Sequence, residues 1–189
     1  MITSTSSSQV KHVVNLQKKA KLRKEEKQFV VEGVKMVSEA PADRLVKVYV
    51  SETFKADNEE FLERMNYDSI GKDVLEIVTD NVFMRMADTQ TPQGIMAVVR
   101  MSDTDLEGIL SDKHNPLLLI IENLQDPGNL GTIVRMAEGA GVTGIIMSSN
   151  TVDIYNPKTI RSTMGSLYRV PVIYCLLYTS PSPRDRSVS

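Results

Sequence analysis

LLLIIENLQDPGNLGTIVRMAEGAG, residues 117–141, predicts a strand, a tight turn and a helix in succession. The apolar run 117–121 has the length of a buried strand. Asp-Pro-Gly at 126–128 predicts a type II turn, because proline fixes φ and the glycine accepts a positive φ. Gly139 and Gly141 predict the end of the helix. We therefore expect the turn at the carboxyl end of a buried parallel strand, where open α/β sheets hold their ligands.

The helix expected over 130–140 has one apolar and one polar face. Its apolar side chains recur at helical spacing: Leu130, Ile133, Val134, Ala137 and Ala140. Asn129, at the expected N-cap, Thr132 and Arg135 are three residues apart and share the polar face, which points toward whatever the turn faces. In an arbitrary helix, Asn129 would only cap and Arg135 would only face solvent.

Composition limits the classes of protein that this sequence fits. A chain of 189 residues with 41% hydrophobic content can bury one full core or two small ones. The formal net charge of −2 excludes a global attraction to nucleic acid, so any such affinity must be local. The single cysteine, Cys175, excludes a disulfide framework within one chain and a cysteine-based zinc cluster, and it suits a reducing compartment.

Neither a metal site nor a membrane segment is expected from the sequence. His12 and His114 are isolated and fit no metal-binding spacing such as HExxH. No apolar run approaches the ~20 residues that a membrane helix needs. The Ser/Thr-rich start, residues 1–9, lacks the apolar segment of a secretory signal. We therefore expect a cytoplasmic protein that binds neither a metal nor a membrane.

Residues 10–28 are basic and carry a narrow apolar stripe, which predicts a helix. Their cations are Lys11, Lys18, Lys19, Lys21, Arg23, Lys24 and Lys27. Lysines and arginines clustered along one element are typical of a segment that contacts nucleic-acid phosphates. They are equally typical of a solvated helix face, so the residues alone leave both interpretations open.

The first half alternates strands with helices, which indicates a compact α/β domain. The expected strands are 29–31, 45–50, 74–78 and 94–99, and the expected helices are 34–40, 58–65 and 81–86. The polar, acidic stretch 101–115 predicts a linker, so this domain is expected over 1–100. Residues 91–94, TPQG, suit a turn, because proline and glycine favour turns.

A second α/β domain is expected after the linker. It runs over 116–175, with strands at 117–121, 144–147 and 170–174 and helices at 130–140 and 157–164. Asn156 as N-cap and Pro157 at the first helical position mark the start of its second helix. Lys158 and Arg161 lie one turn apart there, and Gly165 permits a close backbone approach. The two cations fit a phosphate site or a surface pair equally well.

The pattern Asn-x-Gly-x-x-x-Arg after Asp-Pro-Gly, residues 126–135, resembles motif one of the SpoU/TrmH family of RNA 2′-O-methyltransferases. Further segments resemble the same family. FVVEG (29–33) and TPQG (91–94) resemble its small N-terminal substrate-binding domain, and NPKTIRSTMGS (156–166) and RVPV (169–172) resemble the stretch that follows motif one. In the family, TPQG lies near bound RNA. The resemblance extends from about Val10 to about Ile173, which is most of the chain.

The resemblance implies a fold, an activity and a set of site residues. The fold is a small N-terminal α/β RNA-binding domain like a ribosomal protein, followed by a SPOUT α/β-knot domain. The activity is methylation of a ribose 2′-hydroxyl in RNA, with S-adenosylmethionine as donor and a homodimer as the active form. The RNA would be 23S rRNA, with tRNA as the alternative. The implied catalytic residues are Arg135 and Asn129, and the implied substrate-binding residues are Lys18, Lys19, Lys21, Arg23, Lys24, Thr132, Lys158 and Arg161.

After Tyr174 the composition changes abruptly, and residues 176–189 are expected to be a disordered, non-native tail. The family's Gly-x-Glu-x-x-Gly and Ile-Pro-Met…Ser-Leu-Asn segments, which the resemblance assigns to the cofactor pocket, do not occur in this sequence. We therefore expect an incomplete, C-terminally truncated SPOUT domain and assign no cofactor-binding residue.

Two rival functions stay open. A nucleotide-binding oxidoreductase would use Gly128-x-x-Gly131 after the strand, but GxGxxG is absent and no acidic residue ends the next strand. A non-catalytic RNA-binding module fits a chain without the cofactor segments.

Overall fold

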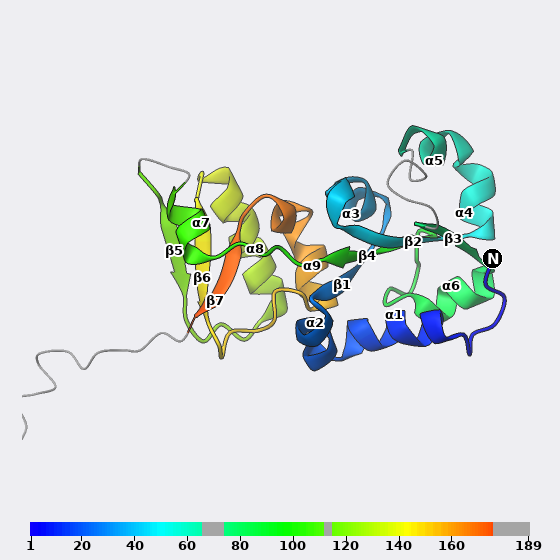
Figure 1. Cartoon of the computed structure of the whole chain (residues 1–189), viewed down its shortest axis with the longest axis horizontal. Coiled ribbons are helices and arrows are strands. Elements are labelled where there is room, and N and C mark those ends of the chain that lie inside the picture. The colour runs from blue at the N-terminus through cyan, green and yellow to red at the C-terminus, as the bar shows by residue number, and fades with distance from the viewer. Residues whose placement is uncertain (66–73, 112–114, 176–189) are drawn as a thin grey trace, which may run out of the picture.

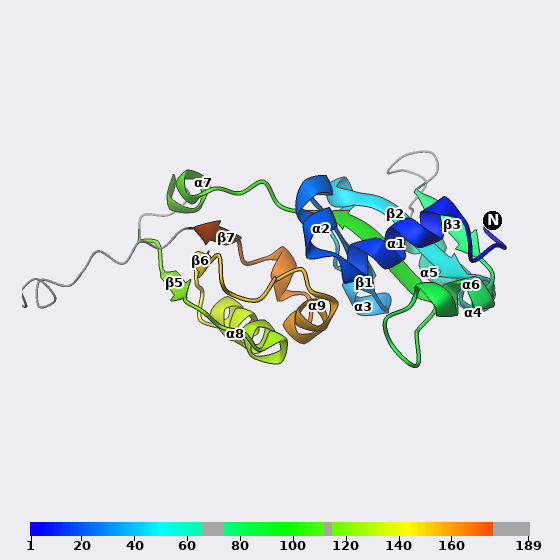
Figure 2. The same cartoon turned by 90° about the horizontal axis from the view of Figure 1, so that it is seen from below.

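The computed structural model describes residues 1–65, 74–111 and 115–175, which form two β-sheets with helices packed on them (Figure 1). The predicted tail 176–189 and His114 lie outside the described residues. The N-terminal and C-terminal halves lie end to end in both views (Figure 1, Figure 2). The α/β class predicted from the sequence is confirmed.

The N-terminal half is built on a mixed four-stranded sheet with the order β1-β4-β2-β3. Its strands are β1 (Gln28–Glu32), β2 (Leu45–Ser51), β3 (Leu75–Val78) and β4 (Ile95–Arg100). β4 pairs antiparallel with β1 and β2, whereas β2 and β3 are parallel. All side chains from Ile95 to Val99 are buried, which explains the continuous apolar sequence of this central strand.

Helices cover both faces of this sheet. They are α1 (Ser8–Lys18), α2 (Ala20–Glu26), α3 (Val34–Ser38), α4 (Glu52–Asp57), α5 (Glu59–Met65), α6 (Asp80–Met86) and the 3-10 turn η1 (Ala42–Arg44). On one face, Leu16 of α1 and Phe83 of α6 pack in a buried cluster with Val30. On the other face, Phe29 and the helices α3 and α4 belong to a second cluster.

Two helices of this half differ from the sequence prediction. The helix predicted over 10–28 is two helices, because the backbone at Lys19 is extended, with φ −114° and ψ 102°. The helix predicted over 58–65 is preceded by α4, whose N-cap Ser51 accepts a hydrogen bond from the Phe54 N–H (3.1 Å). Both α2 and α4 have fewer than two turns, too few for a hydrophobic period to appear in the sequence.

The C-terminal half is built on a parallel three-stranded sheet with the order β5-β6-β7. Its elements are α7 (Leu106–Ser111), β5 (Leu118–Ile121), α8 (Pro127–Gly139), β6 (Gly144–Ser148), α9 (Pro157–Thr163), the 3-10 turn η3 (Ser166–Tyr168) and β7 (Val172–Cys175). Figure 2 shows α8 and α9 on one side of this sheet and α7 on the other. Ile109 of α7 lies directly against Gly144, where an added Cβ would come within 2.7 Å of it.

α8 begins earlier than the sequence pattern predicts. Its N-cap is Asp126, its first residue is Pro127, and Gly128 is helical, so the predicted type II turn is wrong. Proline suits the first helical position because its φ fits the helix and its missing N–H needs no partner there. Asn129 is therefore not the N-cap but lies in the first turn of the helix.

The two halves pack directly on each other. One cluster of buried hydrophobic side chains contains residues of both, among them Phe29 of β1 and Ile160 of α9. The ring centroids of Phe29 and Tyr155 lie 4.7 Å apart. The Tyr168 hydroxyl donates a hydrogen bond to the Met36 carbonyl oxygen (2.9 Å). A shared core therefore joins the halves in addition to the connecting chain.

Residues 91–94, TPQG, precede β4 at the end of a loop. The Gln93 side chain accepts a hydrogen bond from the Val34 N–H (2.8 Å) and so holds the start of α3. Gly94 has φ +85°, and a Cβ there would lie 2.7 Å from Phe54 Cβ, so the position requires glycine. These contacts account for the segment as part of the fold, and its contact with RNA stays a prediction.

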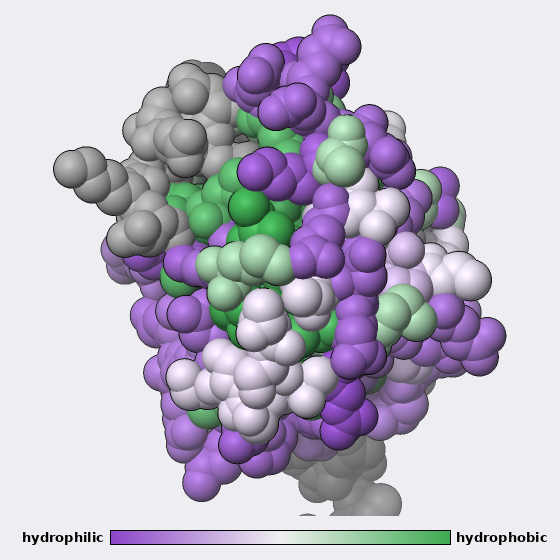
Figure 3. All heavy atoms as spheres, turned by 90° about the vertical axis from the view of Figure 1, so that its right-hand side faces the viewer, coloured by the Kyte–Doolittle hydropathy of each residue, from purple (hydrophilic) through white to green (hydrophobic). Residues whose placement is uncertain are grey.

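The outer end of the N-terminal half, with α4, α5 and α6, faces away from the second sheet (Figure 1). Hydrophilic side chains surround a smaller hydrophobic area on this end (Figure 3). The catalytic and substrate-binding residues implied by the resemblance lie elsewhere, on α8, on α9 and on the segment that contains α1 and α2.

Candidate functional site

α8 places three of its polar residues on one exposed face. Asn129, Thr132 and Arg135, which we call the α8 motif, are exposed, whereas Leu130 and Val134 between them are fully buried. The helical period explains this division, because the buried residues anchor one side of α8 and turn the other toward solvent. The shared exposed face predicted from the spacing is present.

Two members of the α8 motif differ in their present partners. The Thr132 hydroxyl donates a hydrogen bond to the Gly128 carbonyl oxygen (2.9 Å) and can still accept one. Arg135 forms no ion pair with any residue in the described ranges. Its guanidinium can therefore bind an incoming anion without first losing a carboxylate.

α9 crosses α8 closely at Gly131. A Cβ on this buried residue would lie 2.9 Å from the Thr159 carbonyl oxygen and 2.9 Å from the Ser162 carbonyl carbon. Main-chain atoms of α9 thus occupy the space that any side chain at position 131 would need. The glycine therefore allows α8 and α9 to pack closely.

α9 starts as the sequence predicts. Asn156 is its N-cap, with the side chain accepting a hydrogen bond from the Lys158 N–H (2.9 Å), and Pro157 is its first residue. Lys158 is exposed. Arg161 instead donates to the Asp88 carboxylate (2.6 Å), in the loop between α6 and β4. Arg161 must therefore share its charge with a carboxylate of the N-terminal half.

Gly165 faces a carboxylate. It has φ +97°, and a Cβ there would overlap the Glu39 carboxylate of the N-terminal half. Arg169 binds the same carboxylate (2.7 Å to Oε2) and also Glu138 at the end of α8. These hydrogen bonds raise the pKa of Arg169 and lower the pKa of Glu138. The close approach predicted at Gly165 exists, but a protein carboxylate fills it.

Acidification should remove the stabilisation that Glu138 provides. Its hydrogen bond from Arg169 lowers its pKa below the ordinary value of 4.5. The ionised carboxylate therefore stabilises the folded state above the unfolded pKa, and this contribution is lost as the pH falls through the lowered pKa. Because Glu138 is 33% exposed, we expect at most about 1 kcal/mol. Urea unfolding should show a smaller loss of stability below about pH 5 for Glu138→Gln than for the wild type; equal losses would contradict the prediction.

The basic residues of α1 and α2 divide into two groups. Lys18, Lys19, Lys21 and Lys24 are exposed, and we call them the basic arm. Arg23 is only 3% exposed and binds Asp153 of the C-terminal half. Protein partners enclose the Arg23 guanidinium, which does not favour the predicted contact of Arg23 with RNA.

The structure gives no sign of a metal centre or a membrane span where it describes the chain. Among the described residues, no group of three or more His, Cys, Asp and Glu side chains could hold a metal ion. Within the same ranges, no helix has both the length and the apolar character needed to cross a membrane.

Family models match both halves. Residues 116–178 match the SpoU rRNA Methylase family, and residues 7–97 match the MRM3-like substrate binding domain. The chain belongs to the SpoU/TrmH family. The three-stranded parallel sheet with the α8 motif is thus part of a SpoU domain, and the four-stranded sheet is the core of the substrate-binding domain.

Two curated relatives of this SpoU protein are named as rRNA methyltransferases. The mitochondrial rRNA methyltransferase 3 of Homo sapiens is 32% identical over 170 residues, which are 85% of this chain and 38% of that protein. The 23S rRNA (guanosine(2553)-2'-O)-methyltransferase RlmP of Bacillus subtilis is 36% identical over 97 residues, 51% of this chain and 37% of that protein. The chain spans about two-fifths of the length of these relatives.

Solved structures share the fold. A crystal structure of an rRNA methyltransferase from Sinorhizobium meliloti matches with a TM-score of 0.76 and 25% identity, over 93% of this chain and 65% of that one. The AdoMet-bound structure of the Sinorhizobium meliloti rRNA methyltransferase matches with a TM-score of 0.77 and 25% identity, over 93% of this chain and 64% of that one. That SpoU relative therefore binds S-adenosylmethionine.

Sequence reasoning missed the carboxylates that bind the arginines of the site. The pairs are Arg161–Asp88, Arg23–Asp153 and Arg169–Glu39. Their members are 73, 130 and 130 positions apart in the chain. Only packing of the two halves brings them together, so no local pattern could have indicated them.

Proposed function

We propose that the chain carries the RNA-binding half and the catalytic face of an enzyme that methylates ribose 2′-hydroxyls in rRNA, with S-adenosylmethionine as donor. The observation that carries the proposal is the exposed α8 motif in the half that matches the SpoU family. The other half matches a substrate-binding domain and presents the basic arm. The names of the relatives favour rRNA over tRNA.

Arg135 would act as an electrostatic clamp. A guanidinium stays protonated at physiological pH and is a poor base for a hydroxyl. It can hold the phosphate beside the target ribose and stabilise the alkoxide that develops as the 2′-hydroxyl loses its proton. Asn129, six residues N-terminal to it in the α8 motif, would orient the nucleotide. Alignment of the reacting atoms can lower the barrier by ~7–11 kcal/mol.

S-adenosylmethionine, when bound, supplies a methyl group on a positively charged sulfur. The described residues do not form a complete site for it. Ile120 on β5 and Met136 on α8 are 62% and 68% exposed, which indicates an open side of the domain rather than an enclosed pocket. Cavities of about 670 and 640 Å³ lie along residues 102–105, away from the α8 motif. We therefore assign no residue of this chain to binding of the cofactor.

Several finer properties belong to the same proposal. The domain limits are proposed at 1–100, 101–115 and 116–175. A homodimer is proposed as the active form, as the family resemblance implies. A cytoplasmic location is proposed from the sequence, although the vertebrate relatives are named as mitochondrial proteins.

Removing charge from the basic arm should weaken RNA binding. We expect the variant with Lys18, Lys19 and Lys21 changed to glutamine to bind rRNA fragments less tightly. Its plot of log affinity against log salt should be flatter by about 2, because each phosphate contact contributes ~0.7 to the slope for single strands. The control changes three exposed cations at the outer end, Lys55, Arg64 and Arg85, to glutamine. Equal slopes in all three proteins would mean that the arm is only a solvated face.

The alternative function is an RNA-binding module without catalysis, which the exposed Ile120 and Met136 favour. Calorimetry with S-adenosylmethionine on a form of the protein with a complete SpoU domain separates the two. Micromolar binding with methyl transfer to RNA would support the enzyme. RNA binding without cofactor binding would support the module.

A further inference from the structure

Arg23 joins three segments through one buried guanidinium. Its Nε and Nη2 donate to Asp153 Oδ2 at 3.0 and 2.5 Å. Its Nη1 donates to the carbonyl oxygens of Leu16 and Gln17 at 2.6 and 2.9 Å. These carbonyls belong to the last turn of α1, where helix carbonyls lack helical partners. Arg23, which lies on α2, therefore ties the end of α1 to the C-terminal half.

Asp153 lies in the loop that leads into α9. Its second oxygen, Oδ1, accepts a hydrogen bond from the Tyr155 N–H (2.9 Å), directly before the N-cap Asn156. Tyr174 of β7 holds the same loop, donating to the Val152 carbonyl oxygen (3.2 Å) and accepting from the Ile154 N–H (2.8 Å). The Asp153 carboxylate thus connects the arginine to the start of α9.

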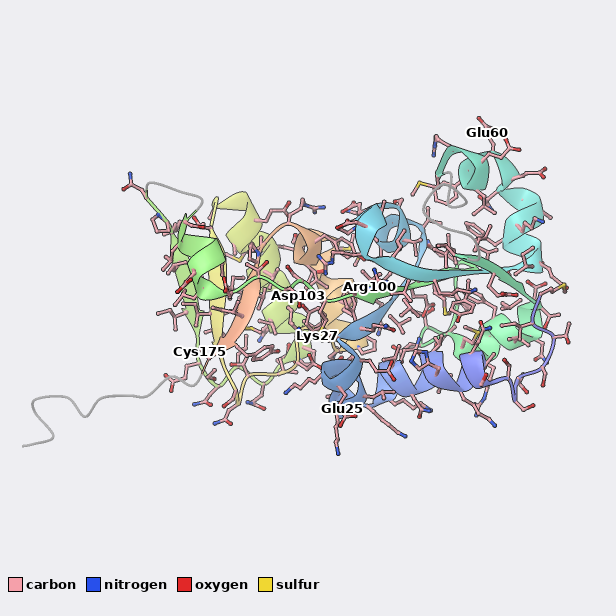
Figure 4. All side chains as sticks on the ribbon, viewed as in Figure 1. Glu25, Lys27, Glu60, Arg100, Asp103 and Cys175 are labelled. Carbon is pink, nitrogen blue, oxygen red and sulfur yellow. The ribbon has the colours of Figure 1, made fainter. Side chains whose placement is uncertain are left out.

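α2 makes further contacts with the same part of the molecule. Lys24 Nζ lies 5.8 Å above the centre of the Tyr174 ring, within the range of a cation–π interaction. Lys27, just after α2, donates to the Asp103 carboxylate (2.9 Å) in the connection between the halves, and Figure 4 shows these two side chains near each other. Arg23 is the buried member of this row of contacts.

We propose that Arg23 and Asp153 are positioning residues, which hold the basic arm in a fixed place relative to α9. The proposal rests on the proposed function, because it assumes that the arm and the cations of α9 bind one RNA. A fixed geometry lets the second group of contacts form at high effective concentration once the first is made. Arg23 itself contacts no phosphate, since its side chain is 4% exposed.

The direction in which Asp153→Asn changes the affinity for RNA tests this proposal. It removes one negative charge, so electrostatics alone predicts that RNA affinity stays equal or rises. Asparagine keeps an acceptor for Arg23 and for the Tyr155 N–H but weakens the link between the halves. If the link positions the arm, affinity for an rRNA fragment falls at least about fivefold and the salt dependence becomes flatter. Unchanged or higher affinity in a folded Asp153→Asn protein overturns the proposal.

Matched variants complete the experiment. Asp103→Asn also removes a carboxylate, the one that binds Lys27 just after α2. Because Asp103 is 80% exposed, the affinity of this variant for RNA should stay equal or rise. Arg23→Met should lower affinity further; it leaves two carbonyls and Asp153 without their partner, so circular dichroism must show that it folds. Arg23→Lys keeps the positive charge and should retain part of the RNA affinity that Arg23→Met loses. Wild-type protein that binds no RNA refutes the proposed function itself, whereas binding that depends on the arm lysines but not on Asp153 refutes only the positioning role.

Discussion

Arg135→Ala is expected to lower the rate of RNA ribose methylation by a factor on the order of 10²–10³, in a form of the protein with a complete SpoU domain. Removal of one positioned donor from a developing oxyanion has an effect of this size. Arg135 is exposed on α8 and carries no ion pair within the described ranges, so its replacement should remove charge from the site without disturbing the fold. The loss should therefore appear in catalysis and not in stability.

The measurement is transfer of labelled methyl groups to an rRNA fragment under single-turnover conditions, with calorimetry of S-adenosylmethionine on the same protein. Affinity for the cofactor should be nearly unchanged. Arg100→Ala, which removes an exposed cation at the end of β4, is the control and should keep its rate. Loss of cofactor binding in Arg135→Ala would assign Arg135 to the cofactor and contradict the clamp.

The sequence predicted those parts of the site that depend on neighbouring residues. The spacing of Asn129, Thr132 and Arg135 sufficed to place them on one face, because a helical period is a local property. Asn156 and Pro157 sufficed to place the start of α9. At the start of α8 the local signal misled, because two structures use the same residues. Asp-Pro-Gly fits a type II turn, but it also fits the first turn of a helix, and the packing of α8 favours the helix.

The partners of the cations could not be predicted, because they depend on how the halves pack. Arg23 and the four lysines of the basic arm are all cationic and occupy one short segment, yet only Arg23 is buried. The extended backbone at Lys19 separates α1 from α2 and allows Arg23 to reach back to the carbonyls of α1. A charge pattern read along the chain treats all five cations alike, so the structure changes the interpretation of one of them.

Gly131→Ala should destabilise the protein by about 1–3 kcal/mol, the usual cost of overpacking a close contact. The added Cβ would lie 2.9 Å from the Thr159 carbonyl oxygen, and this neighbour is backbone of α9, which can yield only by moving the helix. Such a shift would also move Lys158, which lies on α9. The variant should therefore unfold at lower urea concentration and, in an active form, methylate RNA more slowly.

Gly139→Ala is the matched control on the same helix. A Cβ at Gly139 would meet nothing within 4 Å, so alanine should leave stability unchanged or raise it by up to about 1 kcal/mol. The two substitutions add the same methyl group to α8 and differ only in what surrounds it. If they change the urea midpoint equally, helix propensity rather than the α8–α9 contact explains the result. If only Gly131→Ala destabilises, the glycine of the Asn-x-Gly-x-x-x-Arg pattern serves to seat α9 against the helix that carries Arg135, and its place in the motif is structural rather than chemical.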